Sequence, residues 1–164
     1  MKSKWMFALL GVMAIVGVYA GTVLATPPSG QTSTTIARAP FEPMKLKATG
    51  DPANAWRMKL KTHGDSDAYV VGNTFAPNGG TSGWHQHPGP SLIFVTAGTV
   101  TTYMYDGHHC MQHDYSAGQG FVDPGGPDNM HMIKNNGSVE ARTIAVQILQ
   151  SGATRRSDAD DPCS

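Results

Sequence analysis

The chain has 164 residues, a length typical of one domain, and it is 40% hydrophobic and 15% charged, with 19 glycines and 11 prolines. Its 12 basic and 12 acidic residues cancel. The zero formal charge gives no electrostatic case for a nucleic-acid partner and excludes a strongly charged disordered tail. The frequent glycines and prolines favour many short elements joined by turns over a helical bundle.

The N-terminal segment reads as an export sequence. Lys2 and Lys4 precede an uncharged stretch over residues 5–25, and small residues at Val23–Ala25 resemble a signal-peptidase site. Residues 1–25 are therefore either a cleaved signal peptide or an uncleaved helical membrane anchor, since about 20 apolar residues can span a bilayer. Both alternatives export residues 26–164 to the periplasm or the extracellular space. Membrane contact is expected only through an uncleaved N-terminal segment.

Composition divides the exported part into three regions. Residues 26–40, rich in Pro, Ser and Thr, predict a linker. Residues 41–150 predict the folded domain, and residues 151–164 a C-terminal tail.

Short strand-like runs fill the predicted domain. Residues 56–61 alternate between apolar and basic, which predicts a half-buried strand. Further runs rich in β-branched and aromatic residues lie at residues 69–75, 92–95, 99–105, 120–122, 130–133 and 143–149. Many short strands separated by turns predict an all-β sandwich or barrel.

The two cysteines, Cys110 and Cys163, both lie in the exported part. In an oxidising compartment such a pair usually forms a disulfide, which would hold the tail against the domain. The alternative is two free thiols. A cysteine metal site is disfavoured because no C-x-x-C spacing occurs.

Histidines supply the clearest chemical signal. His85 and His87 are two apart, so on a strand they would face the same side and could converge on one ion. By itself this H-x-H pattern is a weak indication of a metal site. A second group, His108, His109 and His113, reads as an exposed polar loop.

The surroundings of His85 and His87 match a longer pattern, G-x5-H-x-H-x(3,4)-E-x6-G. Gly79 supplies the first glycine and Gly98 the last, with every spacing kept. At the position of the glutamate this chain has Ser91.

A second pattern, G-x5-P-x-G-x2-H-x3-N, follows after about twenty residues. Gly118, Pro124 and Gly126 match its first half, and His131 and Asn135 its second half, with two extra residues before the histidine. The two patterns resemble the two motifs of the cupin superfamily, and the match is closest to small, exported, single-domain cupins.

The resemblance implies a cupin double-stranded β-helix, a jelly-roll barrel with its site inside. It also implies that His85, His87 and His131 are metal ligands. Three imidazoles without the usual glutamate favour Zn, Cu, Fe or Ni over harder ions. The family also allows a homodimer paired through sheet edges.

Two functions stay open at this point. The first is a metal-dependent enzyme acting on a small molecule as an oxygenase (a dioxygenase included), isomerase or hydrolase, in which Asp123 or Asp128 could be a general base. The second is a non-enzymatic cupin of the cell envelope that binds a small molecule or a metal. Ser91 favours the second slightly, because a ligand carboxylate is missing there.

Overall fold

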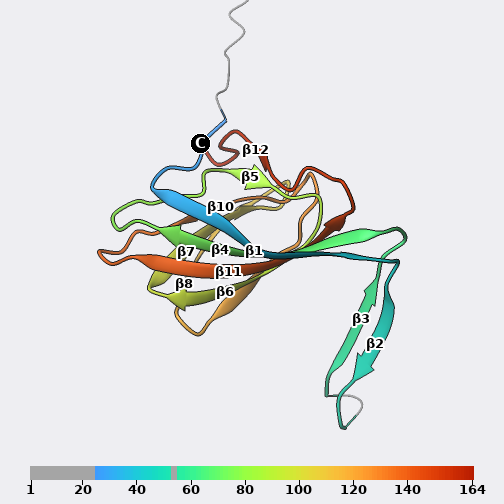
Figure 1. Ribbon diagram of the computed structural model, residues 1–164. Helices are drawn as coiled ribbons and strands as arrows, with labels where there is room; N and C mark the ends of the chain where they lie inside the picture. The colour runs from blue at the N-terminus through green and yellow to red at the C-terminus, as the bar shows by residue number, and fades with distance from the viewer. Residues whose placement is uncertain (1–24, 53–54) are drawn as a thin grey trace, which may run out of the picture.

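The computed structural model describes residues 25–52 and 55–164, and these residues form strands and no helix. The strands are β1 (Gln31–Phe41), β2 (Lys45–Thr49), β3 (Arg57–Lys61), β4 (Ser66–Phe75), β5 (His85–Gln86), β6 (Ser91–Ala97), β7 (Thr99–Tyr105), β8 (Cys110–Ser116), β9 (Gly120–Asp123), β10 (Met130–Lys134), β11 (Ala141–Gln150) and β12 (Ser157–Asp158). Figure 1 shows a barrel made of two sheets, with the hairpin of β2 and β3 extending away from it. The predicted all-β jelly-roll class is confirmed.

The signal or anchor segment predicted for residues 1–25 lies outside the described residues, except for Ala25. In the part of the chain that the structure describes, no helix has the length and apolar character needed to cross a membrane.

The first sheet has the order β1-β4-β11-β6-β9, and all its strand pairs are antiparallel. Its strands β6, β9 and β11 alternate between buried and more exposed residues because successive side chains of a strand point to opposite faces. In β6, Ser91, Ile93 and Val95 are buried, whereas Leu92 and Phe94 are exposed. The inward face of this sheet forms one wall of the barrel.

The second sheet has the order β12-β5-β10-β7-β8. It begins at the short strand β12 of the C-terminal tail, which pairs with β5. Gly98 makes the tight link from β6 in the first sheet to β7 in the second, with a φ of 66° that side chains other than glycine rarely adopt.

A hydrophobic core lies between the two sheets of the barrel. Burial of one such large apolar side chain stabilises the fold by roughly 1.5–3 kcal/mol. The core members are Phe75, Ile93, Val95, Val100, Phe121, Ile133, Ala141 and Ala145.

Part of the predicted linker, residues 26–40, is a strand. β1 covers Gln31–Phe41 and pairs with β4 at the edge of the first sheet. Ten of its 11 residues are exposed, which explains why the segment is rich in Thr and Ser and carries no apolar period. β-branched threonines still favour extended backbone, so the composition of a linker also suits an edge strand.

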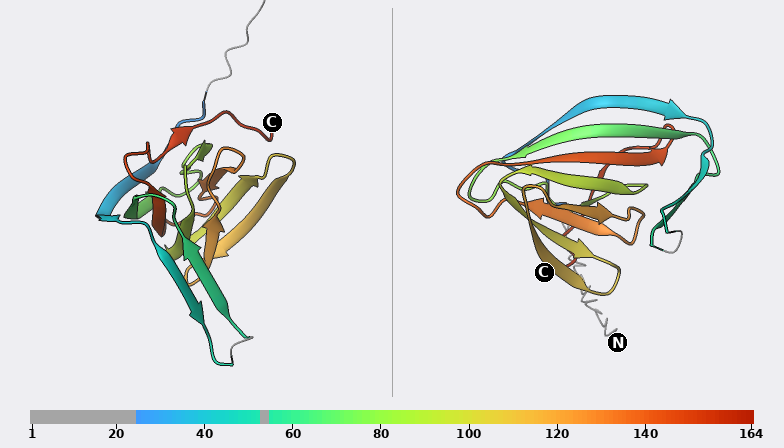
Figure 2. Two further views of the ribbon diagram at one scale, coloured as in Figure 1. Left: turned by 90° about the vertical axis from the view of Figure 1, so that its right-hand side faces the viewer. Right: turned by 90° about the horizontal axis from the view of Figure 1, so that it is seen from below.

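The predicted strand at residues 56–61 exists as β3, but the prediction that it is half-buried was wrong. β3 pairs only with β2, and four of its five residues are exposed. Figure 2 shows this hairpin projecting from the barrel in both views. Lysines lie directly opposite each other along one face, in the pairs Lys45 with Lys61 and Lys47 with Lys59.

Candidate metal centre

Three histidines meet inside the barrel because two strands of the second sheet place them together. His85 on β5 is the cross-strand partner of His131 on β10, and His87 follows directly after β5. All three side chains are buried. One ring nitrogen of each lies within 4.8 Å of those of the other two, and this is the only such group of potential ligands among the described residues.

Backbone carbonyls fix the orientation of two of the imidazoles. Nδ1 of His85 lies 2.9 Å from the carbonyl oxygen of Gly83, and Nδ1 of His87 lies 2.6 Å from that of Arg155. A carbonyl oxygen only accepts, so each Nδ1 carries the hydrogen. Each Nε2 is then left with a free lone pair, which is the arrangement of a metal-ligating histidine.

The histidines are neutral at physiological pH. Burial lowers the pKa of His85 well below its usual range, that of His87 to about 4 and that of His131 to about 3. The positive charge of Arg156 lowers the pKa of His85 and His131 further. Neutral imidazole is the form that binds a metal, so the donor set fits a transition-metal ion.

A buried carboxylate lies behind His131. Oδ1 of Asp123 is 3.6 Å from Nδ1 of His131, a nitrogen that has no hydrogen-bond partner in the described structure. Asp123 is completely buried on β9, and the backbone amide of Gly125 donates to its Oδ1 at 2.9 Å. Burial raises the pKa of Asp123 above its usual value, and the Gly125 hydrogen bond opposes that rise. The carboxylate is placed to orient the His131 ring through Nδ1, which would leave Nε2 for a metal ion.

Ser91 belongs to a row of buried polar side chains across three strands of the first sheet. Gln147 on β11 and Asp123 on β9 are its cross-strand partners. Nε2 of Gln147 donates to Ser91 Oγ at 3.1 Å, and Ser91 Oγ donates to Asp123 Oδ2 at 3.4 Å. The serine thus connects the carboxylate to the wall of the cavity.

The three histidines open onto a cavity of about 120 Å³. In this measure one water needs roughly 10–15 Å³, so the space suits a small molecule. Its lining combines apolar side chains such as Val71 and Ile93 with polar ones such as Gln31 and Asn73. Such a mixture is typical of small-molecule sites.

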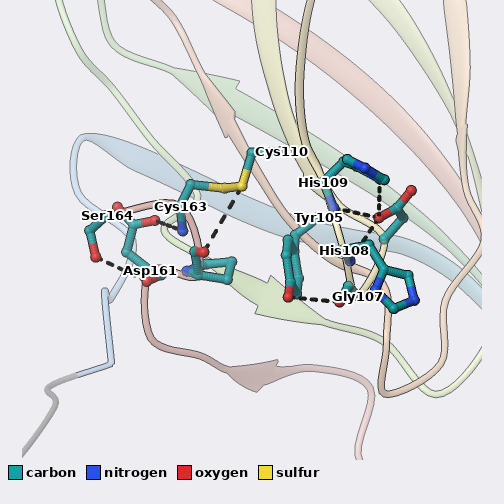
Figure 3. Close-up of a disulfide and its surroundings, with 10 residues drawn as sticks. Tyr105, Gly107, His108, His109, Cys110, Asp161, Cys163 and Ser164 are labelled. Carbon is teal, nitrogen blue, oxygen red and sulfur yellow. Dashed lines mark hydrogen bonds and ion pairs between the residues drawn. A yellow bond between two sulfur atoms is a disulfide. The ribbon is translucent and has the colours of Figure 1, made fainter.

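The C-terminal tail forms part of this site. β12 pairs with β5, so that Asp158 lies opposite His85, and the tail carbonyl of Arg155 accepts from His87. The predicted disulfide is present, and Figure 3 shows it joining Cys110, at the start of β8, to Cys163 near the chain end. β12 and β8 are the two edge strands of the second sheet. The bond therefore holds the end of the tail at the edge opposite β12.

The second histidine group lies apart from this centre. His108 and His109 are exposed in the turn between β7 and β8, where both backbone amides donate to Asp106 (Figure 3 shows the turn). The loop prediction was wrong for His113, which lies on the exposed strand β8. Among the described residues these side chains form no metal-binding group.

Other candidates from the sequence have different places. Of the two candidate carboxylates, Asp123 lies at the centre, whereas Asp128 is exposed in a turn. The polar side chains of Gln147 and Arg155 could not be predicted from the sequence, because no motif includes them and only the pairing of distant strands brings them to the site.

Comparisons with known proteins agree with this architecture. The sequence profile of the family described as "Cupin domain" matches residues 73–147. No curated protein matches the sequence.

Solved structures share the fold. Peruvianin-I, described as a cysteine peptidase from Thevetia peruviana latex, is 19% identical, with 97% of this chain and 90% of that chain covered and a TM-score of 0.53. A recombinant oxalate oxidase in complex with glycolate is 24% identical, with 77% and 54% covered and a TM-score of 0.51.

An oxalate decarboxylase variant from B. subtilis is 15% identical over 61% of this chain and 29% of that chain, with a TM-score of 0.50. The chain spans about half the length of the oxalate oxidase chains that it matches. At these identities the likeness concerns the fold. The two histidine motifs, the two-sheet barrel and the matching profile together show that residues 73–147 are a cupin domain.

Proposed function

We propose that this protein is an exported cupin that binds one divalent transition-metal ion through His85, His87 and His131 and presents it to a small molecule in the barrel cavity. One observation carries the proposal. Two of the three buried imidazoles are anchored through Nδ1 on backbone carbonyls, so that their free nitrogens converge with that of the third.

The donor set narrows the choice of metal. Imidazole suits Zn, Cu, Fe and Ni, and no carboxylate belongs to the convergent group. A bound ion of this kind would acidify water or polarise a substrate, which are the roles of a catalytic three-histidine metal site. Oxygenase (including dioxygenase), isomerase and hydrolase chemistry are the reaction classes proposed for an enzyme of this type.

A non-enzymatic binding protein is the second candidate. It is favoured by the absence of Asp and Glu from the described lining of the cavity. Asp123, the nearest carboxylate, is turned toward His131 and Ser91 rather than into the cavity, so it is poorly placed to take a proton from a ligand.

Export to the periplasm or the extracellular space is also part of the proposal. It is supported by the uncharged stretch at residues 5–25 and by the disulfide, which is typical of oxidising compartments.

Elemental analysis of the full-length chain, purified in detergent without chelator or a histidine tag, tests the metal centre. We expect one equivalent of Zn, Cu, Fe or Ni per chain. The His85→Ala/His87→Ala double variant should hold none, whereas the matched His108→Ala/His109→Ala variant, altered in the exposed turn, should keep it. Metal retained by the first variant, or no metal in the unaltered protein after reconstitution, would contradict the proposal. The metal found would select the assays: oxygen uptake for iron or copper, and hydrolysis or isomerisation for zinc.

A further inference from the structure

Positive charge reaches the cavity from the C-terminal tail. Arg155 and Arg156 both line the cavity, and both directly precede β12, which the pairing with β5 holds beside the histidines. Neither arginine belongs to a cupin motif.

The two arginines are bonded differently. Arg156 already has a carboxylate partner, because its Nε and Nη2 both bond the carboxylate of Asp158, and Nη2 also donates to the carbonyl of Ser82 at 2.6 Å. Arg155 donates through Nη1 to Oε1 of Gln147 at 3.0 Å. Within the described residues, no ion pair joins Arg155 to a carboxylate. A guanidinium has five N–H donors, so most of the donors of Arg155 remain available to a ligand.

The charges around the cavity do not balance without an anion. A divalent ion on the histidines would add two positive charges and Arg155 one, against the single carboxylate of Asp123 behind His131. Charge interactions are stronger inside a protein than in water, so a neutral ligand would leave this excess uncompensated. The guanidinium plane also matches the two oxygens of a carboxylate, which it binds by paired hydrogen bonds.

We propose that the cavity binds a small organic carboxylate, and that Arg155 is the residue that holds its carboxylate group. This inference rests on the proposed metal centre, which supplies part of the positive charge. The cavity of about 120 Å³ limits the ligand to a few carbon atoms. Amide and hydroxyl groups of Gln31, Ser33 and Asn73 on the first sheet can bond the rest of it.

Calorimetric titration of the full-length, metal-loaded protein tests the assignment with three matched pairs of probes: acetate and acetamide, glycolate and glycolamide, malonate and malonamide. We expect at least one carboxylate to bind at least tenfold more tightly than its amide. Arg155→Gln should weaken the binding of that carboxylate at least tenfold, and Arg155→Lys should weaken it less. Arg142→Gln is the control, because Arg142 is exposed and paired with Glu140.

Metal content, measured on the same samples, separates this inference from the proposed function. The contact with His87 comes from the backbone carbonyl of Arg155, so Arg155→Gln should keep one metal per chain. If the metal is present but carboxylates and amides bind equally, the inference is wrong. It is also wrong if Arg155→Gln and Arg155→Lys bind carboxylates as well as the unaltered protein, which would mean that the ion alone selects them. Tighter binding of inorganic phosphate than of any carboxylate would overturn it as well. Absence of metal would instead count against the proposed function.

Discussion

Ser91 occupies the position at which the cupin motif usually carries glutamate, and Asp123 lies opposite it on the adjacent strand. The chain thus keeps a carboxylate near the histidines, but behind His131 rather than among the ligands. A carboxylate that orients a ligating imidazole makes the imidazole a stronger donor. Loss of the ligand glutamate is therefore compatible with a working metal centre.

Asp123→Asn tests this role. We expect metal affinity to fall about 10- to 100-fold, because the amide removes the charge behind His131 while keeping the shape of the side chain. Competition titration of Zn²⁺ against a chromophoric chelator would measure the loss. The control variant Asp128→Asn, in the exposed turn, should bind Zn²⁺ as tightly as the unaltered protein. Equal Zn²⁺ affinities for the two variants would argue against the role of Asp123 in orienting His131.

The buried histidines also predict how the stability of the metal-free protein depends on pH. Their pKa values in the folded state lie below the ordinary value of 6.5. The pKa is about 4 for His87 and about 3 for His131. Below pH 6.5 the unfolded chain therefore binds more protons than the folded one. The free energy of unfolding then falls with falling pH, by up to about 1.4 kcal/mol per pH unit for each histidine. The raised pKa of Asp123 acts in the opposite direction. Since three histidines oppose this one carboxylate, the net effect is a loss of stability as the pH falls.

Urea unfolding of the metal-free protein at pH 7 and pH 5 would show the difference in stability. His85→Gln should reduce the slope, since one titrating group is removed. A free energy of unfolding that stays constant over this range would contradict the expectation.

At single residues, the sequence could predict that three histidines meet, but not what surrounds them. His85, His87 and His131 lie at fixed spacings within motifs, and the structure brings them together as expected. The row of Gln147, Ser91 and Asp123 depends on the register of three strands that are far apart in the chain. No local pattern encodes such a register.

Among the elements, the C-terminal tail is a part of the site that lies outside both motifs. β12 extends the second sheet beside β5, and the disulfide fixes the tail beyond it across a separation of 53 residues. The tail thereby supplies the carbonyl that orients His87.

Cys110→Ser should release the end of the tail. We expect the free energy of unfolding to fall by about 2–4 kcal/mol, as is typical for loss of a disulfide, and metal affinity to fall with it because the anchor of His87 loosens. Thermal unfolding and Zn²⁺ titration measure the two effects. A reducing agent should reproduce them in the unaltered protein and change nothing in the variant. Unchanged metal affinity after reduction would show that β12 holds the site without the disulfide.

The strands differ in how well the sequence predicted them. Those that contain dense runs of β-branched and aromatic residues, such as β6, β7 and β11, were predicted from that composition. β1 and β8 were missed since both are almost entirely exposed and polar. They form through backbone hydrogen bonds to a neighbouring strand, which leaves little trace in hydropathy.

At the scale of the whole molecule, the barrel and the hairpin of β2 and β3 are separate units. The hairpin pairs only with itself, and the backbone amide of Thr62 closes its base by donating to Met44 at 2.9 Å. We expect that replacing residues 45–61 by an Asn-Gly turn leaves the metal content unchanged and shifts Tm by less than about 5 °C. Facing lysines destabilise the hairpin itself, so little stability is lost with it. Loss of metal from the shortened chain would show that the hairpin supports the barrel.

The hairpin also makes the formally neutral chain an electric dipole. Five of the 12 basic residues lie on its strands: Lys45, Lys47, Arg57, Lys59 and Lys61. In the tail, which Figure 1 places at the opposite end of the molecule, three acidic residues, Asp158, Asp160 and Asp161, outnumber the two basic ones, Arg155 and Arg156. Close to an anionic surface, within a Debye length of about 8 Å at physiological ionic strength, the resulting torque turns the hairpin toward the surface and the tail away from it. The side of the barrel that carries the tail would then face the solution.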